Sequence, residues 1–189
     1  MQSARNAFAH NAGFLDACRE DMSLSRRSML LSLPVLTGLL HGCSGDAVTR
    51  MPDLPYTEIN GQARQLGQLQ GQVVVINFWA TSCSTCVKEM PRLIETHNRF
   101  KAQGLETLAV AMSYDPPAYV MQFAESRKLP FRVVMDHDGS LAQAFGDVQL
   151  TPTTLVIDKR GQVVKRYIGE PDFAALDDLL ARLLAQPAG

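Results

Sequence analysis

A run of β-branched and aromatic residues at positions 72–79 constrains the fold more than any other feature of the chain. The run follows Gly71 and has the sequence Gln-Val-Val-Val-Ile-Asn-Phe-Trp. An apolar run of this length, without the alternation of a half-exposed strand, is typical of a strand that is buried on both faces. The run therefore predicts a central strand in a layered α/β protein.

Strand and helix patterns alternate through the rest of the chain from residue 53 onward. A short hairpin is expected before the central strand, at 56–60 and 63–66, and Pro91 predicts a kink in the helix that follows that strand. The order predicts an α/β fold with a central mixed sheet flanked by helices and an N-terminal β-hairpin extension. The further strands are expected at 105–112, 131–135, 153–157 and 162–168, and the helices at 83–102, 117–128, 140–145 and 172–184.

The composition excludes several classes of protein. Of the 189 residues, 46% are hydrophobic and 20% are charged, which is ordinary for a soluble globular chain and argues against disorder or a multi-span membrane protein. The net charge of −1 provides no basic field for nucleic acid. Four cysteines are too few for a small scaffold held together by disulfides. We therefore expect a single domain that binds no nucleic acid. A monomer is also expected.

Residues 22–42 have the features of an export signal. Arg26 and Arg27 precede an apolar run at 29–40, which is too short to span a bilayer but has the length of a signal-peptide core. The arginine pair and its neighbours resemble a twin-arginine signal. The Leu-His-Gly-Cys sequence that ends at Cys43 resembles a lipobox.

These features predict the domain organisation and the location. Residues 1–21 are expected to be an upstream extension or the result of a misassigned start, so that Cys18 has no function. Residues 43–52 are expected to form a tether, and residues 53–189 the folded domain. Lipidation of Cys43 would anchor the protein to a membrane, on the periplasmic or extracytoplasmic side.

The chemistry is expected at Cys83-Ser-Thr-Cys86. Cys83 lies where a buried strand ends and a helix begins, so its sulfur faces the free N–H groups and the positive end of the helix. This environment lowers the pKa of a thiol and supplies thiolate near neutral pH. Cys86 lies one helical turn later and deeper, where it can attack a mixed disulfide formed at Cys83. The pair predicts thiol–disulfide exchange that needs neither a metal nor any cofactor besides the two cysteines.

Residues 77–86, Asn-Phe-Trp-Ala-Thr-Ser-Cys-Ser-Thr-Cys, resemble the active site of thioredoxin-fold proteins, and most closely the TlpA/ResA-like membrane-anchored thiol–disulfide oxidoreductases. The Lys-Glu-Met-Pro sequence at 88–91, the Thr-Pro-Thr-Thr sequence at 151–154 and the pattern of 61–74 extend the resemblance over about 53–186. It implies a thioredoxin-like fold and the reduction of disulfides in exported proteins, for example in apocytochrome c maturation. A membrane thiol donor would supply the electrons.

The resemblance also implies roles for individual residues. Cys83 would be the nucleophile and Cys86 the resolving thiol. Pro152 would be a cis-proline beside the pair, with Thr151 offering its backbone to an incoming peptide. Glu89 matches an acid that assists proton transfer in ResA-like members, and the alternative is a solvated carboxylate near the start of the helix.

Two residues of the strand support the site. Asn77 stands where thioredoxin has a buried aspartate, so no proton acceptor is expected there, and its side chain would otherwise bond to backbone. Trp79 is expected to pack beside the site. Ser82 and Thr85 depart from the Trp and Pro that many relatives carry, and 146–150 lacks a glycine that often precedes the cis-proline, so the reduction potential is not predicted.

Two other interpretations of the cysteine pair stay open, a metal-binding site and a purely structural disulfide. A copper chaperone would hold a soft metal between Cys83, Cys86 and a third ligand. The only histidines left after export are His97, expected on the helix surface, and His137, expected in a loop. The pair could instead be an inert disulfide, although such a short loop is strained and seldom serves stability alone.

Overall fold

The computed structural model describes residues 48–187, and the expected signal segment, with Cys18, Arg26, Arg27 and Cys43, lies outside them. A five-stranded sheet with the order β5-β4-β3-β6-β7 forms the centre of the domain. Strands β3, β4 and β5 are parallel, β6 is antiparallel to β3, and β7 is antiparallel to β6. The strands are β3 (Val73–Trp79), β4 (Leu105–Ala111), β5 (Arg132–Met135), β6 (Thr153–Ile157) and β7 (Val163–Ile168).

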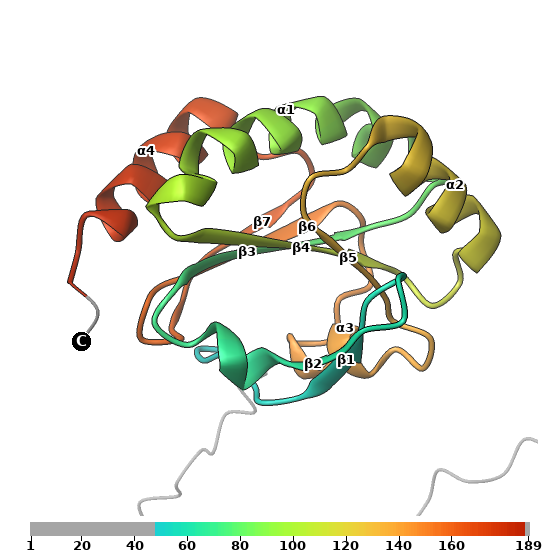
Figure 1. Cartoon of the computed structure of the whole chain (residues 1–189), viewed down its shortest axis with the longest axis horizontal. Coiled ribbons are helices and arrows are strands. Elements are labelled where there is room, and N and C mark those ends of the chain that lie inside the picture. Colours follow the sequence, from blue (N-terminus) through green and yellow to red (C-terminus); the bar gives the residue numbers. More distant parts are fainter. Residues whose placement is uncertain (1–47, 188–189) are drawn as a thin grey trace, which may run out of the picture. The chain divides into compact units, whose positions relative to one another are not determined.

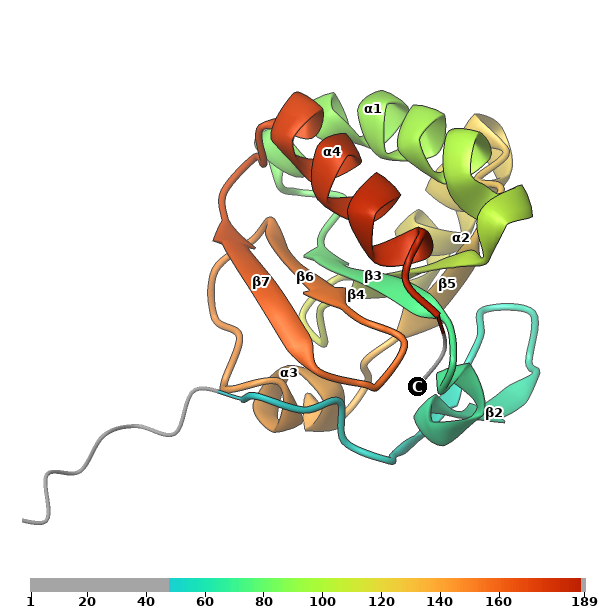
Figure 2. The same cartoon turned by 90° about the vertical axis from the view of Figure 1, so that its left-hand side faces the viewer.

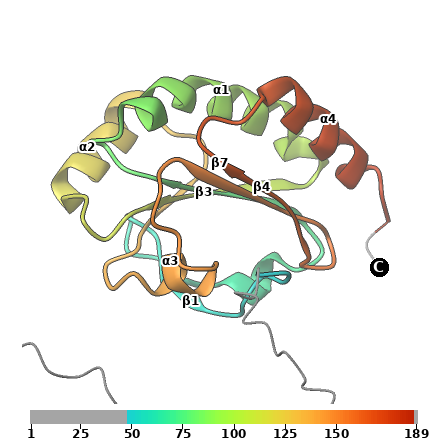
Figure 3. The same cartoon turned by 180° about the vertical axis from the view of Figure 1, so that it is seen from behind.

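Helices cover one face of this sheet, and shorter elements cover the other (Figure 1). The long helices α1 and α4 lie side by side over the sheet, as Figure 2 shows from the side. From behind, α3 and the β1–β2 hairpin lie on the opposite face (Figure 3). The elements are α1 (Ser84–Phe100), α2 (Pro117–Arg127), α3 (Ser140–Ala144), α4 (Phe173–Leu184), β1 (Pro55–Thr57) and β2 (Ala63–Gln65), with 3₁₀ turns η1 (Leu66–Leu69) and η2 (Lys101–Gln103).

The β3 run is continuous because both of its faces are covered, and all seven of its residues are buried. Val73, Val75 and Trp79 belong to the core beneath α1, α2 and α4. The alternate residues Val74, Ile76 and Phe78 belong to a second core on the hairpin face. The predicted thioredoxin-like α/β fold, with its mixed sheet and N-terminal hairpin, is confirmed. Helix α1 continues through Pro91 to Phe100, and the kink expected at this proline stays a prediction.

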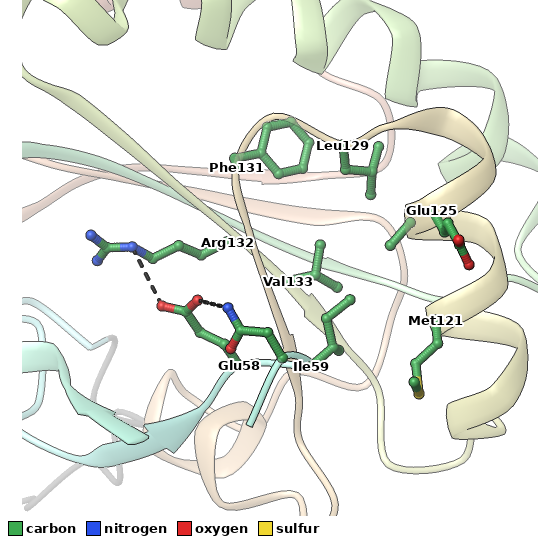
Figure 4. A pocket seen from close by; sticks show the side chains of 10 residues that line it. Glu58, Ile59, Met121, Glu125, Leu129, Phe131, Arg132 and Val133 are labelled. Carbon is green, nitrogen blue, oxygen red and sulfur yellow. Dashed lines mark hydrogen bonds and ion pairs between the residues drawn. The ribbon is translucent and has the colours of Figure 1, made fainter. Parts of the chain in front are cut away.

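The hairpin is shorter than predicted, and it covers the edge of the sheet at β5. Ile59 N–H donates to Val133 O at 2.9 Å, and Glu58 forms an isolated bridge with Val134. The Glu58 carboxylate, 8% exposed, pairs with Arg64 and Arg132. Figure 4 shows the pairing of Glu58 with Arg132 beside a cavity of about 390 Å³ between the hairpin, α2 and β5. Strand edges attract other chains, so the contact protects β5.

Residues 48–52 belong to the folded domain, although the sequence assigns them to a tether. Val163 N–H donates to Thr49 O at 2.9 Å, and Met51 N–H donates to Gly161 O at 2.8 Å. Val48 and Met51 also pack against the second core. The backbone hydrogen-bond partners of this segment lie more than a hundred residues away along the chain, so no local sequence pattern indicates them. In the described residues, no helix is long and apolar enough to cross a membrane.

Candidate active site

The site lies where β3 ends and α1 begins. Cys83 N–H donates to Ala80 O at 3.1 Å, which closes a turn between the strand and the helix. Cys83 has an extended backbone and is the N-cap of α1, and its sulfur accepts a hydrogen bond from Cys86 N–H at 3.2 Å. The attacking position is therefore at the positive end of a 17-residue helix.

Cys83 and Cys86 form a disulfide, with their Cα atoms 5.2 Å apart. The two sulfurs differ in access, since Cys83 is half-buried whereas Cys86 is 0% exposed and belongs to the core beneath α1. An incoming thiol or disulfide can therefore reach only the Cys83 side of the bond.

The loop that enters β6 lies beside the cysteine loop. The Thr151–Pro152 peptide bond is cis. Thr153 is paired with Phe78 of β3, which brings Pro152 next to the end of that strand. Gly169 N–H donates to Pro152 O at 2.8 Å, so β7 supports the loop from its other side.

Glu89 lies one helical turn after Cys86 and is 1% exposed, so it is not the solvated carboxylate of the alternative interpretation. Burial raises the pKa of this carboxyl from its ordinary value of 4.5 to about 7, because the charged form loses its hydration. The nearby Glu170 raises the pKa further, while the hydrogen bond from Asn77 opposes the rise. The site thus holds a buried acid that titrates near neutral pH.

Asn77 connects Glu89 to the strand that follows Pro152. Its Nδ2 atom donates to Glu89 Oε1 at 2.9 Å and to Thr154 Oγ1 at 3.0 Å, so its partners are side chains rather than backbone. Asn77 Oδ1 and Glu89 Oε2 are buried and have no hydrogen-bond partner. The proton acceptor that position 77 lacks is therefore supplied from α1.

Trp79 packs as expected: it is fully buried, and its ring centroid lies 5.0 Å from that of Phe123 on α2.

The copper-chaperone alternative would need one of the two histidines as a third metal ligand. His97 is buried against Thr107 and Phe131, so the expectation of a surface position is wrong, whereas His137 is exposed in a loop. Within residues 48–187 no group of three His, Cys, Asp or Glu side chains is arranged to hold a metal.

One buried carboxylate at the site was missed from the sequence. Asp115, 2% exposed, accepts hydrogen bonds from both Thr81 N–H and Thr81 Oγ1–H, each at 2.6 Å. Its only sequence signal is the Asp-Pro-Pro pattern, which is typical of the start of a helix. Thr81 and Asp115 are 34 positions apart, so only the fold brings them together.

Comparisons with known proteins agree with this geometry. Residues 44–180 match the Redoxin family model. The chain is 38% identical over 118 residues to the thiol–disulfide oxidoreductase ResA of Geobacillus kaustophilus, covering 62% of this chain and 67% of that one. It is 35% identical over 129 residues to ResA of Bacillus subtilis, covering 68% and 71%. A Neisseria meningitidis structure described as a thioredoxin superposes with a TM-score of 0.67 at 40% identity, covering 73% of this chain and 91% of that one.

Proposed function

The chain belongs to the redoxin family and is a thioredoxin-like thiol–disulfide oxidoreductase of the ResA type, and we propose that it reduces disulfides of exported proteins outside the cytoplasm while anchored to a membrane. The observation that carries thiol–disulfide exchange is a disulfide with one accessible and one buried sulfur, next to a buried carboxyl whose pKa is raised to about 7. Such a pair can form a mixed disulfide at one sulfur and release it with the other. The reducing direction is supported by the resemblance to ResA-like proteins.

The reaction begins from the dithiol form. The Cys83 thiolate attacks one sulfur of the substrate disulfide, and the other substrate sulfur leaves as a thiolate that takes up a proton. Cys86 then attacks Cys83 Sγ within the mixed disulfide, which releases the second substrate thiol and forms the Cys83–Cys86 disulfide. The substrate gains two electrons and two protons, and a membrane thiol donor restores the dithiol.

Glu89 serves the second step in this proposal. Cys86 is buried away from water, so its thiol needs a proton acceptor inside the protein before it can attack. The Glu89 carboxylate lies one turn along the same helix and titrates at about 7, so it can take up this proton at neutral pH and release it again. The hydrogen bond from Asn77 orients the carboxyl group for this transfer.

Export and anchoring rest on the sequence before the domain. Arg26, Arg27 and the apolar run at 29–40 support export, and Cys43 supports a lipid anchor. The resemblance to ResA-like proteins supports apocytochromes c among the substrates. Fractionation of cells that express a Cys43→Ala variant tests the anchor: the variant should move to the soluble fraction. Retention in the membrane would mean that the apolar run itself is an uncleaved anchor.

A trapping experiment tests the reductase mechanism. In Cys86→Ala the mixed disulfide at Cys83 cannot be resolved within the protein, so non-reducing gels of membrane extracts should show adducts that reducing agent removes. Mass spectrometry of these adducts would identify the substrates. Cys83→Ala is the matched control and should trap little, because Cys86 is buried. Absence of adducts in Cys86→Ala, together with tight Cu(I) binding by the wild type, would instead indicate a metal chaperone.

A further inference from the structure

Asp115 lies at the connection between β4 and α2 and directs its carboxylate toward the cysteine loop. Both of its oxygens are used: Oδ2 accepts Thr81 N–H and Oδ1 accepts Thr81 Oγ1–H, each at 2.6 Å. Thr81 lies inside the turn that ends at Cys83, whose N–H donates to Ala80 O. The carboxylate therefore holds the middle of the turn that carries the attacking sulfur.

The usual structural role of an aspartate in this position does not account for these contacts. An aspartate at the start of a helix usually acts as the N-cap, where its carboxylate accepts N–H groups of the first turn. Asp115 lies one position before Pro116, which is the N-cap of α2. In this structure α2 has no side-chain cap, and the carboxylate bonds to Thr81 instead. The carboxylate therefore stabilises the cysteine loop and not the start of α2.

The connection that carries Asp115 is itself held rigidly. Asp115 N–H donates to Met112 O at 2.9 Å, and Met112 N–H donates to Trp79 O at 3.0 Å. Pro116 restricts the backbone of the residue before it. The neighbouring Tyr114 hydroxyl lies 3.4 Å from Thr151 Oγ1, so the same connection contacts both loops beside the disulfide.

From this geometry we infer that Asp115 is a positioning residue for Cys83: through Thr81 it holds the sulfur at the start of α1 in the geometry of attack. The inference rests on the thiol–disulfide exchange activity and not on its direction or location. Reacting groups lose rate steeply when their support shifts, by as much as about 10²-fold for 1 Å. Breaking the contact should therefore slow exchange at Cys83 without unfolding the domain.

Four variants of the full chain test this role, in a Cys18→Ser, Cys43→Ser background so that only the active-site cysteines react. Thr81→Val removes the hydroxyl and keeps the charge of Asp115, Asp115→Ala removes the carboxylate, and Thr81→Ser keeps the hydroxyl. Asp158→Ala is the matched control, because Asp158 is also a buried carboxylate that accepts two backbone N–H bonds, from Arg160 and Gln162. It lies in the β6–β7 turn, at the end of the sheet opposite to the cysteines.

The readouts are the alkylation rate of Cys83 in the reduced protein, measured by peptide mass spectrometry, and the rate of insulin reduction with dithiothreitol as donor. Both are measured well below each variant's melting temperature. Thr81→Val and Asp115→Ala should each lower both rates about tenfold, and combining them should lower the rates no further. Thr81→Ser should stay within about twofold of the wild type. Asp158→Ala should lose stability and keep both rates.

Two outcomes would overturn the inference. Wild-type rates in Thr81→Val and Asp115→Ala, with only the melting temperature lowered, would make the contact purely structural. Faster alkylation in Asp115→Ala would show that the carboxylate acts by its charge on the thiolate rather than by position. Neither outcome bears on whether the protein is a reductase, which the Cys86→Ala trap decides separately.

Discussion

At the scale of single residues, the acid of this site comes from the helix rather than from the strand. The amide of Asn77 cannot accept a proton from a thiol, but its N–H groups hold Glu89 and Thr154. Because the carboxyl is 1% exposed and its Oε2 has no partner, ionisation is costly and the proton is retained to about pH 7. A group that binds and releases its proton near neutrality is suited to proton transfer.

The raised pKa of Glu89 predicts how stability depends on pH. Unfolded Glu89 loses its proton near 4.5 whereas the folded form keeps it to about 7, so the folded protein binds more protons in this window and loses stability as the pH rises through it. The loss is about 3 kcal/mol at most and should be absent from Glu89→Gln. Urea unfolding of the oxidised protein at pH 4 and pH 8 measures it.

Glu95→Gln is the control for this prediction, because Glu95 is an exposed carboxylate on the same helix, with its side chain 58% exposed. It should change the pH dependence little. If Glu89→Gln lost as much stability as the wild type between these two pH values, the pH dependence would belong to another group and the raised pKa of Glu89 would be contradicted.

The unequal access of the two sulfurs predicts unequal reactivity in the reduced protein. Cys83 is half-buried at the start of α1, whereas Cys86 is 0% exposed. At pH 7 alkylation should modify Cys83 at least about tenfold faster than Cys86, since reaction requires an accessible thiolate. Peptide mass spectrometry after short exposure to iodoacetamide measures both rates, and equal rates would favour a structural or metal-binding pair.

At the scale of elements, the cysteine helix is held in place by α4. Asp177 of α4 accepts Thr96 Oγ1–H at 2.7 Å and pairs with Arg99, and both partners belong to α1. The Asp177 residue is 8% exposed, so its charge depends on these two partners. The contact joins the second half of α1, far from the cysteines, to the last helix.

Removing this contact should therefore lower stability and leave the chemistry unchanged. We expect Asp177→Ala to lower the free energy of unfolding by about 2 kcal/mol, because it leaves Thr96 and Arg99 without their acceptor. Asp178→Ala, which changes the exposed neighbour on the same helix, should cost less than about 0.5 kcal/mol. Urea titrations measure the difference. A fall in the Cys83 alkylation rate of folded Asp177→Ala would contradict the expectation that this contact affects stability alone.

At the scale of the whole described domain, the strand pairing begins before residue 53. Thr49 and Met51 each share a backbone hydrogen bond with the β6–β7 hairpin, and Val48 packs into the core on that side. A chain that starts at Val48 should therefore be more stable than one that starts at Asp53, by about 2 kcal/mol. Chemical denaturation of both chains tests this, and equal stabilities would show that the segment is only a tether.

The sequence by itself determined the features that depend on neighbouring residues. The buried strand follows from the continuous apolar run at 72–79, and the position of Cys83 at a helix start follows from the strand that ends just before it. Most helix and strand positions were also predicted, since periodicity reports which face of an element is buried. The pattern at 151–154 located Pro152 through resemblance to a family, because no composition rule predicts a cis bond.

Tertiary structure decided every feature in which a side chain meets a distant segment. Glu89 accepts a hydrogen bond from Asn77, 12 positions away, and Asn77 in turn donates to Thr154, 77 positions away. The contact between Asp115 and Thr81 joins two connections at the same edge of the sheet, and the burial of His97 depends on β4. A single side chain has the same local sequence whether it meets water or a folded core. Its burial, its partners and its pKa are therefore set only when distant strands and helices pack together.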